Sequence, residues 1–371
     1  PALPRDFITQ LTTEEVGIKE AKFMKPNIFT IATKELSQDG FFTWLLQWAD
    51  SKNVQYDKEL NAAAQDLVRH LISQQFSVQD LNVTTVETWR QWNHVDILAE
   101  VNDDFVIVIE DKINAAEHSQ QLERYKQIAT EHYKDENKKL VFIYLKTGNE
   151  SAATLKKVVQ KGFAVIDRKA VLNIFNQRHI DNHIFLEFKE HLTEIENQTN
   201  AFGTLERITT SWKAAEGFFM ALQDKLQDGD WRYVSNQMGG FLGFWYYWTG
   251  TEDYSLYIQI ENAFDNGIKL VVKIGDWEAS TSTLYYVLGH LQTIAPNHGL
   301  TISKPYRYRT GETSTLAIVD NAFPTDSEGK FDLDKFVTTL RSLERTLDDF
   351  CDQENDEHSR QQGIAASGAE E

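Results

Sequence analysis

Residues 94–112 read HVDILAEVNDDFVIVIEDK and contain two apolar runs typical of β-strands. The runs VDILAEV and FVIVIEDK flank Asn102-Asp103-Asp104, and Asn and Asp tolerate the positive-φ geometry of a tight turn. The pattern therefore predicts a β-hairpin. Asp96 lies seven residues before Asp103 and Glu110 seven after it, so a turn centred there brings the two carboxylates opposite each other.

The polar residues of this hairpin favour a cation site. Side chains alternate along a strand, so Glu110 and Lys112 share one face while Asp111 points away. Two carboxylates facing each other between apolar strands repel, and burial is costly unless a cation lies between them. Mg²⁺ suits all-oxygen ligands and commonly takes one or two carboxylates. The alternative from the residues alone is an ordinary hairpin whose polar side chains face solvent.

The spacing resembles a known signature. Asp96, then a hairpin, then Glu110-Asp111-Lys112 is similar to the D…(D/E)-x-K motif of the PD-(D/E)XK nuclease superfamily, with Val95 in place of the leading Pro. Residues 119–126 (SQQLERYK) resemble the Q-x-x-x-Y helix of RecB-like members. Residues 86–100 are similar to one bacterial branch, as is an upstream helix pattern made of Glu35, Phe41, Trp44, Leu45 and Leu46. The resemblance covers roughly the first two hundred residues.

The resemblance implies a restriction-endonuclease-like α/β core, with a mixed central sheet flanked by helices, and a Mg²⁺-dependent nuclease for which Mn²⁺ can substitute. Asp96 and Glu110 would bind the metal together with the backbone carbonyl of Asp111. Lys112 would orient the attacking water or stabilise the transition state. The other implied site residues are Gln121, near the metal water or a phosphate, Tyr125, packed under the site, and Glu35, in support. Glu87 is a further candidate that we interpret as structural.

Composition restricts the function. A single cysteine, Cys351, excludes an internal disulfide framework and a Cys-based zinc site. No apolar run is long enough to cross a bilayer, and residues 1–10 lack a signal-peptide pattern, so we expect a cytoplasmic protein without membrane contact. The net charge of −19 opposes long-range attraction of nucleic acid, so either a local basic surface or a partner must bring the substrate.

The 371 residues suggest two domains and a tail. We expect a nuclease-like domain at 1–200, an α+β accessory domain for substrate selection or sensing at 201–350, and a disordered acidic tail at 351–371. In the first domain, helices are predicted at 11–23, 31–48 (interrupted at Asp39-Gly40), 57–76, 115–133, 152–161 and 169–177. Strands are predicted at 81–92, at 140–146 and at 163–167, in addition to the hairpin.

The second domain reads as an antiparallel sheet with helices and carries no recognised catalytic motif. Residues 304–309 (KPYRYR), within a strand-like segment at 304–320, interleave Lys304, Arg307 and Arg309 with two tyrosines. That pattern can grip phosphates and stack bases, and we predict a nucleic-acid contact there. A strand with one basic and one aromatic face would produce the same letters.

The function expected from the sequence is metal-assisted hydrolysis of nucleic acid, with DNA favoured over RNA, in anti-phage defence or DNA processing. An RNA-directed nuclease is one alternative, because hydrolysis at the phosphate is indifferent to the sugar. Another is a noncatalytic sensing or binding protein with the nuclease fold. The acidic balance favours a protein partner or a homo-oligomer, whereas the intact Asp-Glu-Lys set favours catalysis.

Overall fold

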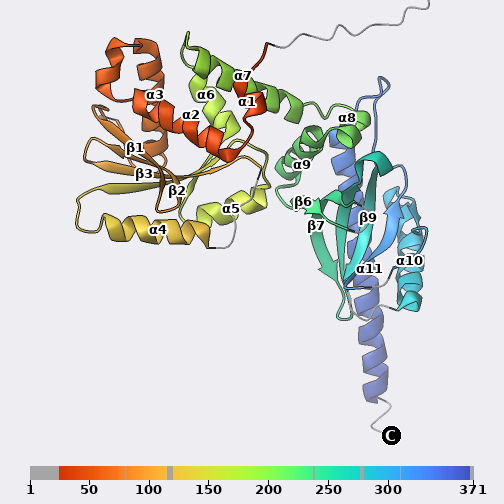
Figure 1. The fold of residues 1–371 in the computed structure, drawn as a ribbon. Coiled ribbons are helices and arrows are strands. Elements are labelled where there is room, and N and C mark those ends of the chain that lie inside the picture. The colour runs from red at the N-terminus through yellow and green to blue at the C-terminus, as the bar shows by residue number, and fades with distance from the viewer. Residues whose placement is uncertain are drawn as a thin grey trace, which may run out of the picture.

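A computed structural model describes residues 25–79, 81–114, 120–236, 239–275, 280–309 and 311–367 (Figure 1). It contains a mixed five-stranded sheet flanked by helices and a second, antiparallel sheet with its own helices. The predicted α/β class with an additional α+β region is therefore confirmed. The helix expected at 11–23 lies outside the described residues.

The first sheet has the strand order β1-β2-β3-β4-β5. Its first three strands are antiparallel neighbours and its last three are parallel neighbours, which gives the mixed sheet expected. The strands are β1 (Val86–Trp92), β2 (Val95–Val101), β3 (Phe105–Lys112), β4 (Lys139–Lys146) and β5 (Ala164–Asp167). All eight residues of the central strand β3 are buried, including its three charged residues.

The hairpin between β2 and β3 has the predicted register. Val101 pairs with Phe105 and Ile97 pairs with Ile109, and one further step of this register sets Asp96 opposite Glu110. The turn contains Asn102 at φ 57° and Asp103 at φ 59°, the left-handed conformation that Asn and Asp tolerate. The chain therefore reverses where the sequence indicates.

Helices cover both faces of this sheet. Ile107 and Ile109 pack into one core, and Val106 and Val108 pack into another on the opposite face. The first core includes α1 (Ile28–Ile31), α2 (Glu35–Trp48), α3 (Lys58–Ser73), α6 (Arg168–Phe175) and α7 (His183–Thr199). The second includes α4 (Gln121–His132) and α5 (Ala152–Gln160). A short 3-10 helix, η1 (Ser51–Gln55), links α2 to α3.

Some local predictions in this part are wrong. Helix α2 runs without a break through Asp39-Gly40, because Asp39 is buried against the sheet instead of ending the helix. Leu36, expected on the inward face, is 57% exposed. Strand β1 begins only at Val86, and Trp89 on it is 38% exposed because β1 is the edge strand of the sheet.

The second sheet has the order β10-β11-β9-β8-β7-β6, and all its neighbours are antiparallel. Its strands are β6 (Asp230–Val234), β7 (Phe241–Gly250), β8 (Ser255–Asn262), β9 (Ile268–Gly275), β10 (Ile302–Ser303) and β11 (Thr313–Val319). The helices beside it are α8 (Leu205–Thr210), α9 (Trp212–Leu226), η2 (Phe264–Asn266), α10 (Thr281–Ile294), η3 (Ala295–His298) and α11 (Leu333–Ser367). One core unites this sheet with α9, α10 and α11.

Two expectations for this region are wrong. Residues 304–309 form a loop between β10 and β11 instead of a strand, and Pro305 there lacks the N–H that a strand ladder uses. The tail expected to be disordered from Asp352 continues α11 as far as Ser367 (Figure 1). Its glutamate, glutamine, arginine and alanine residues are good helix formers, and they extend a helix already nucleated by packing.

Within the described ranges, no helix combines the length and the apolar character that a bilayer crossing demands.

Candidate active site

The ammonium group of Lys112 lies at the centre of the candidate site. Its Nζ forms an ion pair with Glu110, lies 3.8 Å from Asp96 Oδ2 and 4.0 Å from Glu35 Oε2. It also donates to the backbone carbonyl of Asp111 at 3.1 Å. The structure thus brings together, around one cation, the four groups that the sequence assigned to a metal or to its support.

The hairpin and α2 orient the two outer carboxylates. Asp96 Oδ2 accepts the Asp111 N–H at 3.0 Å, and its Oδ1 accepts from Gln91 Nε2 at 3.1 Å. Glu35 is the first residue of α2, and its Oε1 accepts the Ile113 N–H at 3.2 Å. Both carboxylates therefore bind backbone at the carboxyl end of β3, which fixes them relative to Lys112.

Burial dominates the electrostatics of Glu110. Burial raises the pKa of Glu110 to about 8, and the charge of Asp96 adds to this, while Lys112 acts in the opposite direction. Burial by itself would lower the pKa of Lys112, but Glu110 and the other two carboxylates outweigh it, so that pKa is raised. The two groups stabilise each other's charged forms in an apolar strand.

Asp111 points to the opposite face of the sheet, as alternation predicts. Its Oδ1 accepts from Gln38 Nε2 at 2.6 Å, and Gln38 Oε1 accepts from Thr147 Oγ1 at 2.6 Å. Its side chain also contacts Asp39 of α2. Burial raises the pKa of Asp39 to about 6 and holds the pKa of Asp111 well above its usual range, so the pair favours holding a proton.

The predicted Gln-Tyr pair lies on α4, on the face of the sheet opposite to α2. Gln121 Nε2 donates to the Tyr125 hydroxyl at 2.8 Å, and Tyr125 is buried in the core beneath that face. The contacts described for Gln121 do not reach the carboxylates around Lys112. Glu87 is exposed and pairs with Glu100, four residues along β2 from Asp96, which supports the structural interpretation of Glu87.

The basic cluster at 304–309 belongs to the second sheet and is not part of this site. Lys304 Nζ lies over the rings of Tyr285 and Tyr308 and donates to the Tyr285 hydroxyl at 3.1 Å. Tyr306 is 99% exposed. The loop thus presents aromatic and basic side chains at the surface.

Sequence reasoning missed several polar residues at the site. Gln38 and Asp39 occupy buried positions on α2, and Thr147 follows β4. Lys146 ends β4 in register with Lys112, is 1% exposed and pairs with Glu150 at 3.3 Å; burial lowers its pKa. The sequence feature that could have identified them is a polar residue at a position where the helical or strand pattern predicts an apolar one.

The donor set fits a hard divalent cation in its chemistry. Glu110 offers a buried carboxylate whose ion-pair partner is the Lys112 ammonium, and Asp96 and the Asp111 carbonyl add further oxygen donors. Two carboxylates and a carbonyl match the modest protein ligation of Mg²⁺, which keeps several waters. Among the described residues, no group of three or more His, Cys, Asp or Glu side chains is arranged as a ready metal cage. The carboxylates instead converge on Lys112.

Comparison with known proteins supports one family. The model of the PD-(D/E)XK nuclease superfamily matches residues 26–207, which include the whole first sheet and every residue around Lys112. No curated protein and no solved structure matches the chain significantly.

The first prediction concerns the pH dependence of stability without metal. A carboxyl whose pKa rises on folding, as for Glu110, binds its proton more tightly when folded, so stability is lost as the pH rises from its ordinary pKa to about 8. Glu110→Gln removes this group. In urea unfolding with EDTA, we expect wild type to lose more stability than Glu110→Gln between weakly acidic and weakly alkaline pH. Equal losses would show that Glu110 does not hold a raised pKa.

Proposed function

Because residues 26–207 belong to the PD-(D/E)XK nuclease superfamily, we propose that the chain is a metal-dependent nuclease that hydrolyses phosphodiester bonds of nucleic acid. The observation that carries this proposal is the convergence of Asp96, Glu110 and the Asp111 carbonyl on the ammonium of Lys112. A hairpin with a purely structural role would be more stable with apolar side chains at these positions, because burying charges costs more free energy than burying apolar groups.

In this proposal Asp96, Glu110 and the Asp111 carbonyl hold Mg²⁺, with Mn²⁺ as a substitute. A bound divalent ion lowers the pKa of water and offsets charge on a phosphate. The water oxygen would form a bond to phosphorus as the bond to the leaving sugar oxygen breaks, with the proton of the water passing to solvent and a proton from solvent reaching the leaving oxygen. Lys112 orients that water or donates to the phosphate oxygen as charge develops. Gln121 is assigned to a phosphate or the water, with Tyr125 and Glu35 as supports.

We favour DNA over RNA as the substrate, and anti-phage defence or DNA processing as the setting, in a cytoplasmic protein. The second unit, in this proposal the accessory domain of residues 201–350, selects the substrate or senses a trigger. The net charge of −19 keeps two alternatives open: a protein partner or second copy that delivers nucleic acid, and a noncatalytic protein that binds or senses with the same fold. Incubation with DNA and RNA in Mg²⁺, Mn²⁺ or EDTA tests the proposal.

The second prediction concerns the metal. Asp96→Asn removes one charged ligand, so titration calorimetry with Mn²⁺ should show a site whose affinity falls sharply in this variant. Asp103→Asn is the matched control, because Asp103 is an exposed aspartate in the turn of the same hairpin. Equal Mn²⁺ affinity in wild type and Asp96→Asn would refute the ligand assignment.

The third prediction separates chemistry from folding at Lys112. Lys112→Met should abolish cleavage and also destabilise the fold by about 3–5 kcal/mol, because it leaves Glu110 buried without its partner. Adding Glu110→Gln should recover part of the stability in urea unfolding without restoring cleavage. Cleavage by Lys112→Met at the wild-type rate would exclude Lys112 from the chemistry.

The fourth prediction concerns the loop at 304–309. Replacing Lys304, Arg307 and Arg309 with Ala should weaken substrate binding and lower its salt slope by about one per lost phosphate contact. Cleavage at saturating substrate should persist. The matched control replaces three exposed basic residues of the same unit, Lys330, Lys335 and Arg345. If both triple variants bind alike with the wild-type salt slope, the loop does not contact nucleic acid.

A further inference from the structure

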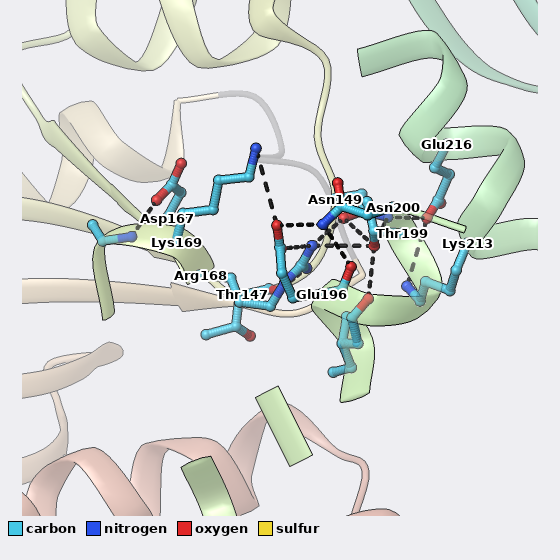
Figure 2. A network of polar contacts seen from close by, with 12 residues as sticks. Thr147, Asn149, Asp167, Arg168, Lys169, Glu196, Thr199, Asn200, Lys213 and Glu216 are labelled. Carbon is cyan, nitrogen blue, oxygen red and sulfur yellow. Dashed lines mark hydrogen bonds and ion pairs between the residues drawn. The ribbon is translucent and has the colours of Figure 1, made fainter. Parts of the chain in front are cut away.

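Arg168, the first residue of α6, is the hub of a buried polar network (Figure 2). It is 3% exposed and donates to four acceptors on two segments, the residues that follow β4 and the C-terminal end of α7. These are the Thr147 carbonyl at 2.6 Å, Asn149 Oδ1 at 2.8 Å, Thr199 Oγ1 at 3.1 Å and Glu196 Oε2 at 2.9 Å. A buried guanidinium with this many partners holds its neighbours in one arrangement, because losing any acceptor leaves a buried donor unpaired.

The network continues into the second unit through Asn149. Its Nδ2 donates to Glu216 Oε2 at 2.8 Å and to Thr199 Oγ1 at 3.1 Å (Figure 2). Glu216 lies on α9, whose Phe218 and Phe219 belong to the core of the second sheet. Glu216 Oε1 also accepts from Trp212 Nε1 at 2.6 Å, so its carboxylate is fixed at both oxygens.

In the other direction the network reaches the candidate active site through Thr147. The Thr147 N–H donates to the Lys112 carbonyl at 3.2 Å, and its hydroxyl donates to Gln38, which holds Asp111. The neighbouring Gly148 has no room for a side chain, because a Cβ there would lie 1.8 Å from the Ile113 carbonyl oxygen. The backbones that follow β3 and β4 are therefore in close contact beside Thr147, which Arg168 binds.

We propose that Glu216, Asn149 and Arg168 are positioning residues for the active site, through which α9 of the second unit holds the catalytic end of β3 and β4. This inference rests on the proposed nuclease function for its catalytic consequence. Its structural consequence, a strand end held in place from the second unit, does not depend on substrate or metal. The second unit is then a required part of the active site's support as well as a recognition module.

The fifth prediction tests the coupling by amide hydrogen exchange and kinetics on the full chain. In Glu216→Leu, peptides covering 107–114 and 141–149 should exchange faster than in wild type, because the strand ends lose their support. The kcat for cleavage should fall about tenfold or more with KM nearly unchanged, because the Lys112 backbone shifts while substrate-binding surfaces remain. Glu206→Leu, at an exposed glutamate on α8, is the control and should leave both properties unchanged.

If Glu216→Leu folds poorly, a second set of variants, which moves the carboxylate from position 216 to position 149, provides the test. Asn149→Asp sets a second carboxylate against Glu216, so it should raise exchange at the strand ends and lower kcat. Combining Asn149→Asp with Glu216→Gln restores a donor facing an acceptor, and both properties should return toward wild type. A double variant no better than Asn149→Asp alone, or exchange unchanged in every variant, overturns the proposal.

The two proposals fail separately. Suppose that wild type neither binds Mn²⁺ nor cleaves nucleic acid, but amide hydrogen exchange at the strand ends still rises in Glu216→Leu and Asn149→Asp. The nuclease function is then refuted and the coupling stands. If wild type cleaves while neither exchange nor kcat responds to Asn149→Asp, the coupling falls and the nuclease function stands.

Discussion

The ion pair between Lys112 and Glu110 is the interaction on which the rest of the site depends. Glu110 is fully buried in β3 and Lys112 is 6% exposed, so neither charge is shielded by water and each needs the other. Asp96 and Glu35 accept hydrogen bonds from backbone N–H groups at the same strand end, and they add negative charge around the Lys112 ammonium. The positive charge of Lys112 thus offsets the repulsion between several carboxylates at the end of an apolar strand.

The opposite face of the β3 end also carries buried polar side chains. Asp111 is held by Gln38, and Gln38 by Thr147, whose backbone also joins β4 to β3. From Thr147 the contacts pass to Arg168 and across Asn149 to Glu216 of α9. The end of β3 is therefore fixed from α2, from β4 and from the second unit. The described hydrogen bonds therefore hold this strand end from three directions.

Much of this was readable from the sequence, for local reasons. The hairpin, its register and the division of Glu110 and Asp111 between two faces follow from turn residues and period-two alternation. Gln38, Asp39 and Thr147 were not predicted, because their importance comes from long-range contacts between α2, β3 and β4 that no spacing encodes. The loop at 304–309 differs from the predicted strand because Pro305 lacks the N–H that a strand ladder uses, and the end of α11 is helical because it extends a helix that packing already stabilises.

The central claim is that the Lys112 cluster is a cation site which accepts a divalent metal. Crystals soaked in Mn²⁺ would test it most directly through the anomalous scattering of manganese. The account predicts a peak in contact with Asp96, Glu110 and the Asp111 carbonyl, with the Lys112 ammonium moved away from Glu110. A saturating soak that leaves the ammonium on Glu110 and shows no peak among these residues would contradict it.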